Sequence, residues 1–165
     1  MRRQSSQNNM NQNKVTLLAF KNTSAELLVS GMDFPTVFLP SDKLQDSEIA
    51  IEEIRKAAVI ICFGQKPQIK NKICLELIAK NNGSTIATNF DIESFKEKLE
   101  QQNVSYSESQ NSGTSYCNLV YWNSLNYIKD NNLSCKFLFI HIPFEKNISN
   151  ISEVREKLHC VIKSL

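Results

Sequence analysis

Short apolar runs recur along the chain, and residues that favour turns separate them. Runs rich in β-branched and aromatic residues predict strands at 15–20, 36–39, 58–63, 73–78, 104–106 and 136–142. The run at 58–63 is continuously apolar and ends at Gly64, which is typical of a central strand covered on both faces. In the run at 73–78 a single charge, Glu76, interrupts the apolar pattern.

Apolar residues at intervals of three and four predict helices between these strands. The pattern covers 46–56, 91–102 and a segment that ends near Asp130, and 24–29 has room for one or two helical turns. Asn150 followed by Glu153 resembles a capping box, and predicts a last helix whose buried stripe contains Ile151, Val154, Leu158, Val161 and Leu165. Strands that alternate with helices predict an α/β protein, a three-layer α/β/α sandwich around a mostly parallel, mixed sheet.

The composition suits one globular domain and argues against several classes of partner. The 165 residues are enough for a single core, and we expect a disordered polar tail at 1–13 and one domain at 14–165. A net charge of +2 with 22% charged residues gives no polybasic footprint for nucleic acid or a membrane surface. The apolar runs are too short to cross a bilayer, and no secretory segment is recognisable. Five cysteines without a Cys-x-x-Cys pair predict free thiols in a reducing compartment, hence a cytoplasmic protein.

The stretch at 109–130, SQNSGTSYCNLVYWNSLNYIKD, is the centre of the candidate chemistry. A turn built on Ser112, Gly113 and Thr114 leads into the helical pattern and places Cys117 in its first turn. Unpaired N–H groups and the positive end of the helix dipole favour a thiolate there, which would lower the pKa of the thiol and make it a nucleophile. The alternative is a small buried cysteine that only packs, the more frequent role of a lone cysteine.

His141 and Glu76 are the other candidates for catalysis. His141 closes an apolar strand at a carboxyl end, where α/β sheets place ligand sites, and a core histidine with one hydrogen bond is the common alternative. Glu76 would be costly to bury unless it were paired, and a solvent-facing edge position is its alternative. A Cys, a His and a Glu are what a cysteine hydrolase uses, since the imidazole deprotonates the thiol and the carboxylate orients the ring.

The remaining histidine and cysteines are given structural roles. We expect His159 on the surface of the last helix. Packing is the expected role of the other cysteines, which are Cys62, Cys74, Cys135 and Cys160. Two histidines far apart in the sequence and the lack of ligand pairs argue against a metal site.

Several blocks of the sequence resemble the pyroglutamyl peptidase I family, the pyrrolidone-carboxylate peptidases. SGTSYCN at 112–118 and FIHIP at 139–143 are similar to the family's S-A-G-T-Y-x-C-N and H-V-P blocks. IICFGQ at 60–65 and ICLELIAKN at 73–81 are similar to its strand ending in Gly-Gln and its I-x-x-E-R-V-A-x-N block, and LLAFKNTSAELL at 17–28 resembles its opening strand. The blocks follow one another in the family's order from Val15 onward.

The resemblance implies a role for each matching residue. Cys117 matches the nucleophile, His141 the general base and Glu76 the orienting acid, and the substrate-binding residues would be Phe20, Asn22 and Gln65. It also implies an α/β/α cysteine peptidase that removes N-terminal pyroglutamate from peptides, needs no cofactor and forms a dimer or tetramer. A non-catalytic or altered-specificity relative that binds a ligand or a partner remains the alternative.

The departures from the family fall on the parts that bind substrate. The aromatic loop after the opening strand is absent, and the glycines after Gly-Gln are replaced by Lys66, Pro67 and Gln68. The arginine after the catalytic glutamate is Leu77, and the segment between Asn82 and Asp91 is shorter. The resemblance therefore implies retained chemistry with altered specificity.

Overall fold

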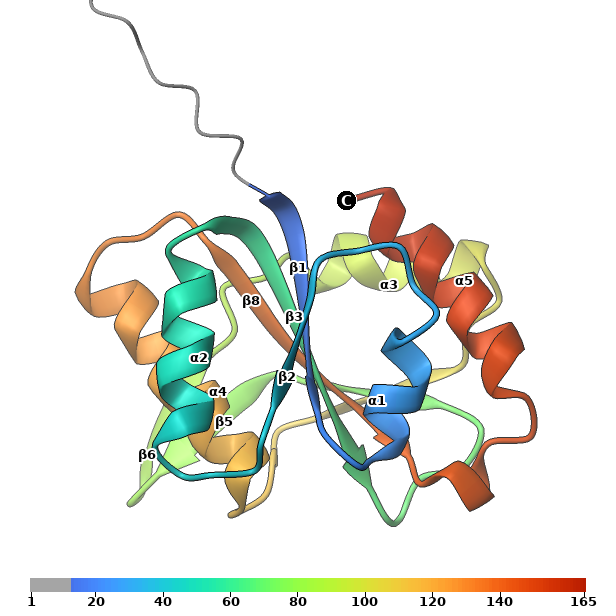
Figure 1. The fold of residues 1–165 in the computed structure, drawn as a ribbon, viewed down its shortest axis with the longest axis horizontal. Coiled ribbons are helices and arrows are strands. Elements are labelled where there is room, and N and C mark those ends of the chain that lie inside the picture. The colour runs from blue at the N-terminus through green and yellow to red at the C-terminus, as the bar shows by residue number, and fades with distance from the viewer. Residues whose placement is uncertain (1–12) are drawn as a thin grey trace, which may run out of the picture.

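The computed structural model of the protein describes residues 13–165, and its elements alternate between strands and helices (Figure 1). The strands are β1 (Asn13–Phe20), β2 (Thr36–Leu39), β3 (Ala57–Lys66), β4 (Ile73–Glu76), β5 (Ile78–Asn81), β6 (Ser84–Ala87), β7 (Tyr106–Ser109) and β8 (Lys136–Pro143). The helices are α1 (Ser24–Val29), α2 (Gln45–Ile54), α3 (Ile92–Gln101), α4 (Tyr116–Asp130), the 3-10 turn η1 (Glu145–Asn147) and α5 (Ile151–Lys163). The predicted polar tail lies outside the described residues, apart from Asn13, which begins β1.

The main sheet has six strands in the order β2-β1-β3-β8-β4-β7. Neighbours are parallel except β4 and β8, which run antiparallel and leave the sheet mostly parallel and mixed, as predicted. β5 and β6 form a separate antiparallel hairpin. Asn82 and Gly83, which connect them, both have positive φ, the backbone of a tight hairpin turn.

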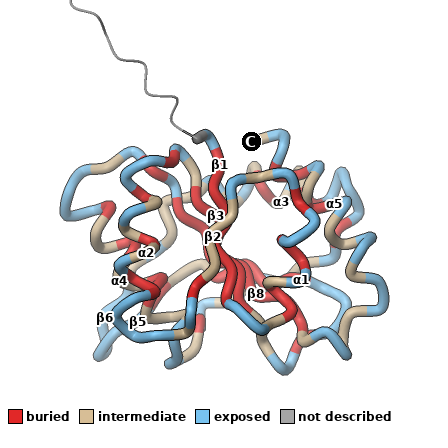
Figure 2. Tube along the Cα trace, viewed as in Figure 1, coloured by how far each residue is buried: buried red, intermediate tan, exposed pale blue. Residues whose placement is uncertain are grey.

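Helices cover both faces of the sheet, so the predicted three-layer sandwich is confirmed. Apolar residues of α1, α3 and α5 pack on one face, and those of α2 and α4 pack on the other. The central strand β8 is buried along nearly its whole length, and its neighbour β3 is buried from Ile60 to Gly64 (Figure 2). Continuous apolar strands are what a sheet covered on both sides requires.

Of the predicted strands only 36–39 has the observed bounds, and three of the others differ in ways that have a physical reason. β3 continues past Gly64 to Lys66, because Gln65 and Lys66 still pair with β8. The strand predicted at 73–78 ends at Glu76, and the chain leaves the sheet at Leu77 to enter the hairpin, an element that was not predicted. The strand predicted at 104–106 begins only at Tyr106, because the Val104 amide still closes the end of α3 on the Leu99 carbonyl at 2.9 Å.

The last helix begins as predicted. The Asn150 side chain accepts a hydrogen bond from the Glu153 amide at 3.1 Å and caps α5. Leu158 and Val161 of the predicted stripe are buried, and its other members pack against the same core. Among residues 13–165, no helix has the length and apolar character needed to cross a membrane.

Candidate active site

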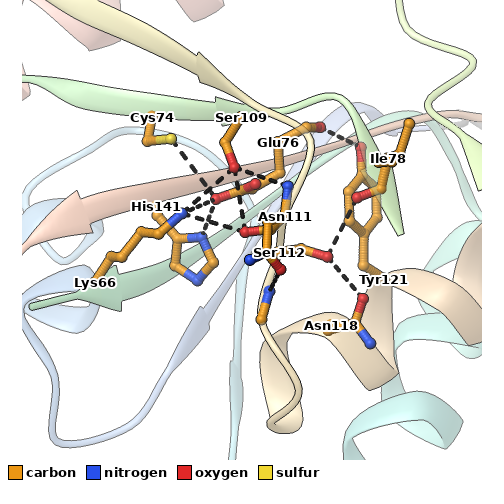
Figure 3. Close-up of polar contacts among 11 residues, drawn as sticks. Lys66, Cys74, Glu76, Ile78, Ser109, Asn111, Ser112, Asn118, Tyr121 and His141 are labelled. Atoms are coloured by element: carbon orange, nitrogen blue, oxygen red, sulfur yellow. Dashed lines mark hydrogen bonds and ion pairs between the residues drawn. The ribbon is translucent and has the colours of Figure 1, made fainter. Parts of the chain in front are cut away.

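Glu76 and His141 form a buried pair in the centre of the main sheet (Figure 3). The Glu76 Oε1 atom lies 2.7 Å from His141 Nδ1, and the two residues are 0% and 4% exposed. The antiparallel register of β4 and β8 sets Glu76 opposite Phe139, two residues before His141, so both side chains lie on one face of the sheet. A carboxylate on Nδ1 fixes the ring and leaves Nε2 to exchange a proton with another group.

The surroundings of Glu76 keep its carboxylate ionised. Burial raises the pKa of Glu76, but the hydrogen bond and charge of His141, with the nearby Ser109 hydroxyl and Lys66 ammonium, lower it more. The net pKa lies below its ordinary value of 4.5. An ionised carboxylate can hold a histidine and stabilise it when it takes up a proton.

Cys117 is the second residue of α4, and its sulfur lies against the main chain of Gly64. A Cβ atom placed on Gly64 would come within 2.7 Å of the Cys117 sulfur and 3.0 Å of the Phe139 ring. Gly64 on β3 is the register partner of His141 on β8. The sequence therefore needs glycine here to admit the thiol beside the Glu76–His141 pair, although the hydrogen bonds of the described residues do not include one between Cys117 and His141.

The electrostatics of Cys117 correct the expectation of a low pKa. Burial raises the pKa of this thiol to about 12, and the negative charges of Glu76 and Asp46 add to the effect. Its own backbone N–H at the helix start lowers the pKa, but by less than burial raises it. The resting group is a thiol, so it needs a base to become a nucleophile.

Hydrogen bonds hold the start of α4 at two places. Asn118 accepts from the Ser112 hydroxyl at 2.7 Å and from the Lys80 amide at 3.0 Å, which ties the first turn to β5. One turn later, the Tyr121 hydroxyl donates to the Glu76 carbonyl at 2.7 Å. Ser115 begins α4 without a side-chain cap, so the first amides of the helix remain able to donate to a ligand.

The structure separates the three predicted substrate-binding residues. Phe20 is buried against Phe139, whose ring in turn packs on His141, with ring centroids 6.5 and 4.9 Å apart. Gln65 follows Gly64 in β3, and its Oε1 atom accepts hydrogen bonds from the backbone and hydroxyl of Ser24, at the start of α1.

Asn22, the third of these residues, is exposed. Its backbone is left-handed, with φ 58°, and its amide donates to Glu26 at 2.6 Å. Asn22 and Gln65 line a depression of about 270 Å³, together with Thr23, Ser24, Glu26, Leu27 and Glu145. Phe20 thus lies with the catalytic candidates, and the other two lie with α1.

The remaining cysteines and the second histidine agree with the sequence analysis only in part. Cys62, Cys74 and Cys135 are buried, as expected for packing residues. Cys160 is exposed, which corrects its predicted packing role, because it falls on the outer side of α5. His159 is partly covered by Phe34, with ring centroids 5.0 Å apart. Within the described residues, no cluster of His, Cys, Asp and Glu has the size and arrangement to hold a metal ion.

Sequence reasoning missed four residues that build the site. Gly64 and Lys66 were noted only as the end of a strand and as a departure from the family, and Asn118 and Tyr121 were given no role. The signal for Gly64 was present, since a glycine inside an apolar strand often marks a close approach of another group. Tyr121 and Asn118 had no such signal, because their partners are main-chain atoms far away in the sequence.

Comparisons with known proteins agree with this architecture. No protein-family profile matches the chain. A pyrrolidone-carboxylate peptidase of Brachyspira hyodysenteriae is 29% identical, over 74% of this chain and 70% of that protein. A second one, from Brevibacillus brevis, is 26% identical over 79% of this chain and 70% of that protein.

Solved structures of such peptidases share the fold. Pyroglutamyl peptidase I of Bacillus amyloliquefaciens superimposes with a TM-score of 0.76 at 17% identity, covering 90% of this chain and 94% of that one. The pyrrolidone carboxyl peptidase of Thermococcus litoralis gives 0.74 at 16% identity, covering 92% of both chains. The chain is thus similar in sequence to pyrrolidone-carboxylate peptidases along most of its length and shares the fold of their solved structures.

Proposed function

We propose that this protein is a cysteine peptidase that removes N-terminal pyroglutamate from peptides. The observation that supports it most is the buried Glu76–His141 pair at 2.7 Å, with the Cys117 sulfur against Gly64, the strand neighbour of His141. The curated relatives and the solved structures with this fold are named for this activity. No cofactor or metal takes part in the proposed reaction.

The first half of the reaction transfers the acyl group to the enzyme. His141 takes the Cys117 proton on Nε2 while the sulfur attacks the carbonyl carbon of the pyroglutamyl residue, because the raised pKa of the thiol leaves no thiolate in the resting state. The oxyanion that forms can accept hydrogen bonds from the uncapped amides of α4. His141 then gives its proton to the leaving amine, the C–N bond breaks, and a thioester remains on Cys117.

The second half releases the product. His141 takes a proton from water as the water oxygen attacks the thioester carbonyl. The C–S bond breaks, the sulfur regains the proton from His141, and pyroglutamate leaves. Glu76 stays ionised throughout and stabilises the imidazolium in both halves.

Substrate binding in this proposal uses Phe20, Asn22 and Gln65. Phe20 would supply an apolar wall beside Phe139. Gln65 binds Ser24 only through Oε1, so its amide NH₂ is available as a donor to a substrate carbonyl. Because the aromatic loop of the family is absent, we propose that selectivity for the lactam ring is weaker than the chemistry.

The test is turnover of pyroglutamyl-aminocoumarin by the purified protein, with mass analysis of a quenched reaction. We expect release of aminocoumarin and pyroglutamate, and a pyroglutamyl adduct on the peptide that contains Cys117. Absence of turnover and of any adduct with pyroglutamyl, prolyl and alanyl aminocoumarins would reject this function.

A non-catalytic relative that binds a ligand or partner is the second candidate. The raised pKa of Cys117 and the lack of a hydrogen bond from it to His141 in the described residues favour this alternative. Such a protein would bind pyroglutamyl-proline in calorimetry but leave it intact. Hydrolysis of the dipeptide would exclude this candidate.

We also propose a cytoplasmic location and a homo-oligomer, a dimer or tetramer. Free cysteines throughout the described residues support a reducing compartment. The oligomer is proposed from the family resemblance alone. Light scattering on the eluted peak of a size-exclusion column would measure the mass, and a monomer of 18.8 kDa would refute it.

A further inference from the structure

Lys66, the last residue of β3, reaches the carboxylate that holds His141 (Figure 3). Its Nζ atom lies 3.0 Å from Glu76 Oε1, the same oxygen that binds His141. The Lys66 side chain is 26% exposed, whereas that of Glu76 is 0% exposed. The Lys66 ammonium group therefore lies on the solvent side of the site and pairs with a fully buried carboxylate.

Lys66 also reaches the segment that leads to Cys117. Its Nζ atom lies 3.3 Å from the Asn111 carbonyl and 3.5 Å from the Ser109 hydroxyl. Asn111 directly precedes Ser112, which binds Asn118 in the first turn of α4. One ammonium group thus connects the orienting acid with the loop before the nucleophile.

The hydrogen bonds of Glu76 are concentrated on one of its two oxygens. Oε1 binds His141 and Lys66, and lies 3.6 Å from the Cys74 sulfur, which donates to it. The other oxygen, Oε2, is buried without a partner among the described residues. Lys66 and His141 therefore share one oxygen position, and together they fix the plane of the carboxylate.

We propose that Lys66 is a positioning residue for the reaction: it anchors the Glu76 carboxylate against His141 and fixes the loop before Cys117. The proposal deepens the proposed function and rests on it. Lys66 itself touches no reacting atom. Titratable groups on several elements face the pair, namely Lys66 on β3, Cys74 on β4, and Cys117 and Tyr121 on α4, with Asp46 on α2 acting on Cys117.

Removal of the Lys66 charge should move the acid limb of the kcat/KM profile in one direction only. A positive charge beside a site disfavours proton uptake there, so its loss makes every nearby group bind protons more readily. Activity that needs an ionised Glu76 and a base at His141 then appears only at higher pH. The acid limb of the kcat/KM profile should move upward whichever of the two groups it reports.

The experiment compares Lys66→Met, Lys66→Arg and Lys96→Met with the wild type. For Lys66→Met we expect kcat at pH 7 to fall about tenfold, KM to change little, and the acid limb to rise by about one pH unit. Lys66→Arg keeps the charge and should restore the limb. Lys96 has a similar exposure of 20% and pairs with Glu93 and Glu108 rather than with Glu76, so Lys96→Met should leave the profile unchanged.

An NMR titration tests the proposal without turnover. The side-chain carboxyl carbon signal of Glu76 is identified by its loss in Glu76→Gln. In Lys66→Met the midpoint of the Glu76 signal should move up by about one pH unit, because the Lys66 hydrogen bond lowers the pKa of Glu76, and in Lys96→Met it should stay. Lys66→Gln serves the same purpose if Lys66→Met does not fold.

The outcomes separate the two proposals. An unchanged Glu76 midpoint together with an unchanged acid limb would overturn the role of Lys66, even in an active enzyme. A protein that hydrolyses no pyroglutamyl amide but shows the shifted midpoint would reject the proposed function and retain the hold of Lys66 on the Glu76–His141 pair.

Discussion

The groups proposed for chemistry and those proposed for substrate binding are built in opposite ways. Around Glu76, side chains from several elements converge on one residue, and the atoms that would react, the Cys117 sulfur and His141 Nε2, stay outside these hydrogen bonds. Around Asn22 and Gln65, polar atoms form hydrogen bonds with the start of α1. The Asn22 backbone amide donates to Glu26, and Gln65 Oε1 accepts from Ser24.

The proposed catalytic groups are thus held more firmly in place than the proposed recognition groups. Preorganised groups that need no rearrangement are what a rate enhancement requires. Recognition needs groups that a substrate can complete, and here the Asn22 backbone amide and Gln65 Oε1 are already used within the protein, which leaves the Gln65 NH₂ group. The two regions should therefore respond to substitution independently.

The largest effect should come from Cys117→Ala. Loss of the nucleophile should lower kcat/KM on the order of a millionfold, in practice to the detection limit, because no thioester can form. Thermal unfolding should stay close to that of the wild type. The matched control is Cys160→Ala, which removes an exposed thiol on another helix and should leave turnover intact. Residual wild-type rates in Cys117→Ala would refute the mechanism.

Glu76→Gln should have the next largest effect. The ring of His141 would lose the charge that stabilises its imidazolium, while nucleophile and base remain. We expect kcat/KM to fall about a hundred- to ten-thousandfold, with measurable activity left. Steady-state rates on one aminocoumarin substrate measure this. A variant as active as the wild type would mean that Glu76 has only a structural role.

The same variant should change how stability depends on pH. The pKa of Glu76 is lower in the folded protein than its ordinary 4.5, so its contribution to stability is complete above pH 4.5 and is lost as the pH falls through the folded pKa. Urea unfolding at several pH values between 2.5 and 7 should show a smaller acid loss in Glu76→Gln. Parallel curves for the two proteins would contradict this assignment.

Gly64→Ala should have an intermediate effect on chemistry. The added methyl group would lie 2.7 Å from the Cys117 sulfur and 3.0 Å from the Phe139 ring, so the thiol must move. We expect about a hundredfold lower kcat and a loss of about 1–3 kcal/mol in stability.

Gly31→Ala is the matched control for this substitution. The nearest atoms to its methyl group would be those of the flexible Arg155 side chain, also at 2.7 Å, and not those of Cys117 or His141. It should cost some stability and leave kcat unchanged. Equal kcat in both glycine variants would show that the sulfur does not depend on Gly64.

The smallest effect concerns selectivity and tests the recognition surface. Without the aromatic loop, the preference for pyroglutamyl over prolyl and alanyl aminocoumarins should be smaller than in a peptidase that has the loop. The expected difference is about 1–3 kcal/mol, or roughly 10- to 200-fold. In Gln65→Ala, any remaining preference should fall further, with little change in the rate on alanyl substrate. Strict pyroglutamyl specificity would show that another segment encloses the ring.

The sequence predicts the layers and the order of the elements because apolar periodicity reflects which face of each element is buried. It also identifies Glu76 and His141 from their apolar strands. That they meet is implied by the family resemblance and not by their spacing, because the pairing depends on the antiparallel register of β4 and β8, which sequence spacing does not encode.

Two errors have specific physical causes. The hairpin at β5–β6 was missed although Asn82-Gly83 is a strong hairpin signal, because the apolar run at 73–78 was treated as one strand. The pKa of Cys117 was expected to be low because the helix start is visible in the sequence. The burial that raises it to about 12 comes from the packing of α4 on the sheet, which is not visible there.

The start of α4 is hydrogen-bonded to two different parts of the molecule. Asn118 binds Lys80 in the small hairpin, while Tyr121 binds Glu76 in the main sheet. Local opening of the hairpin would release the turn that contains Cys117, while the helix from Tyr121 onward stays protected by the core. Amide hydrogens at 116–119 should therefore exchange with solvent at rates close to those of the hairpin amides. They should exchange faster than the amides at 121–128. The position of Cys117, the proposed nucleophile, would then fluctuate with the β5–β6 hairpin. A change in the hairpin turn at Asn82 and Gly83 would therefore alter the position of Cys117 without contacting it.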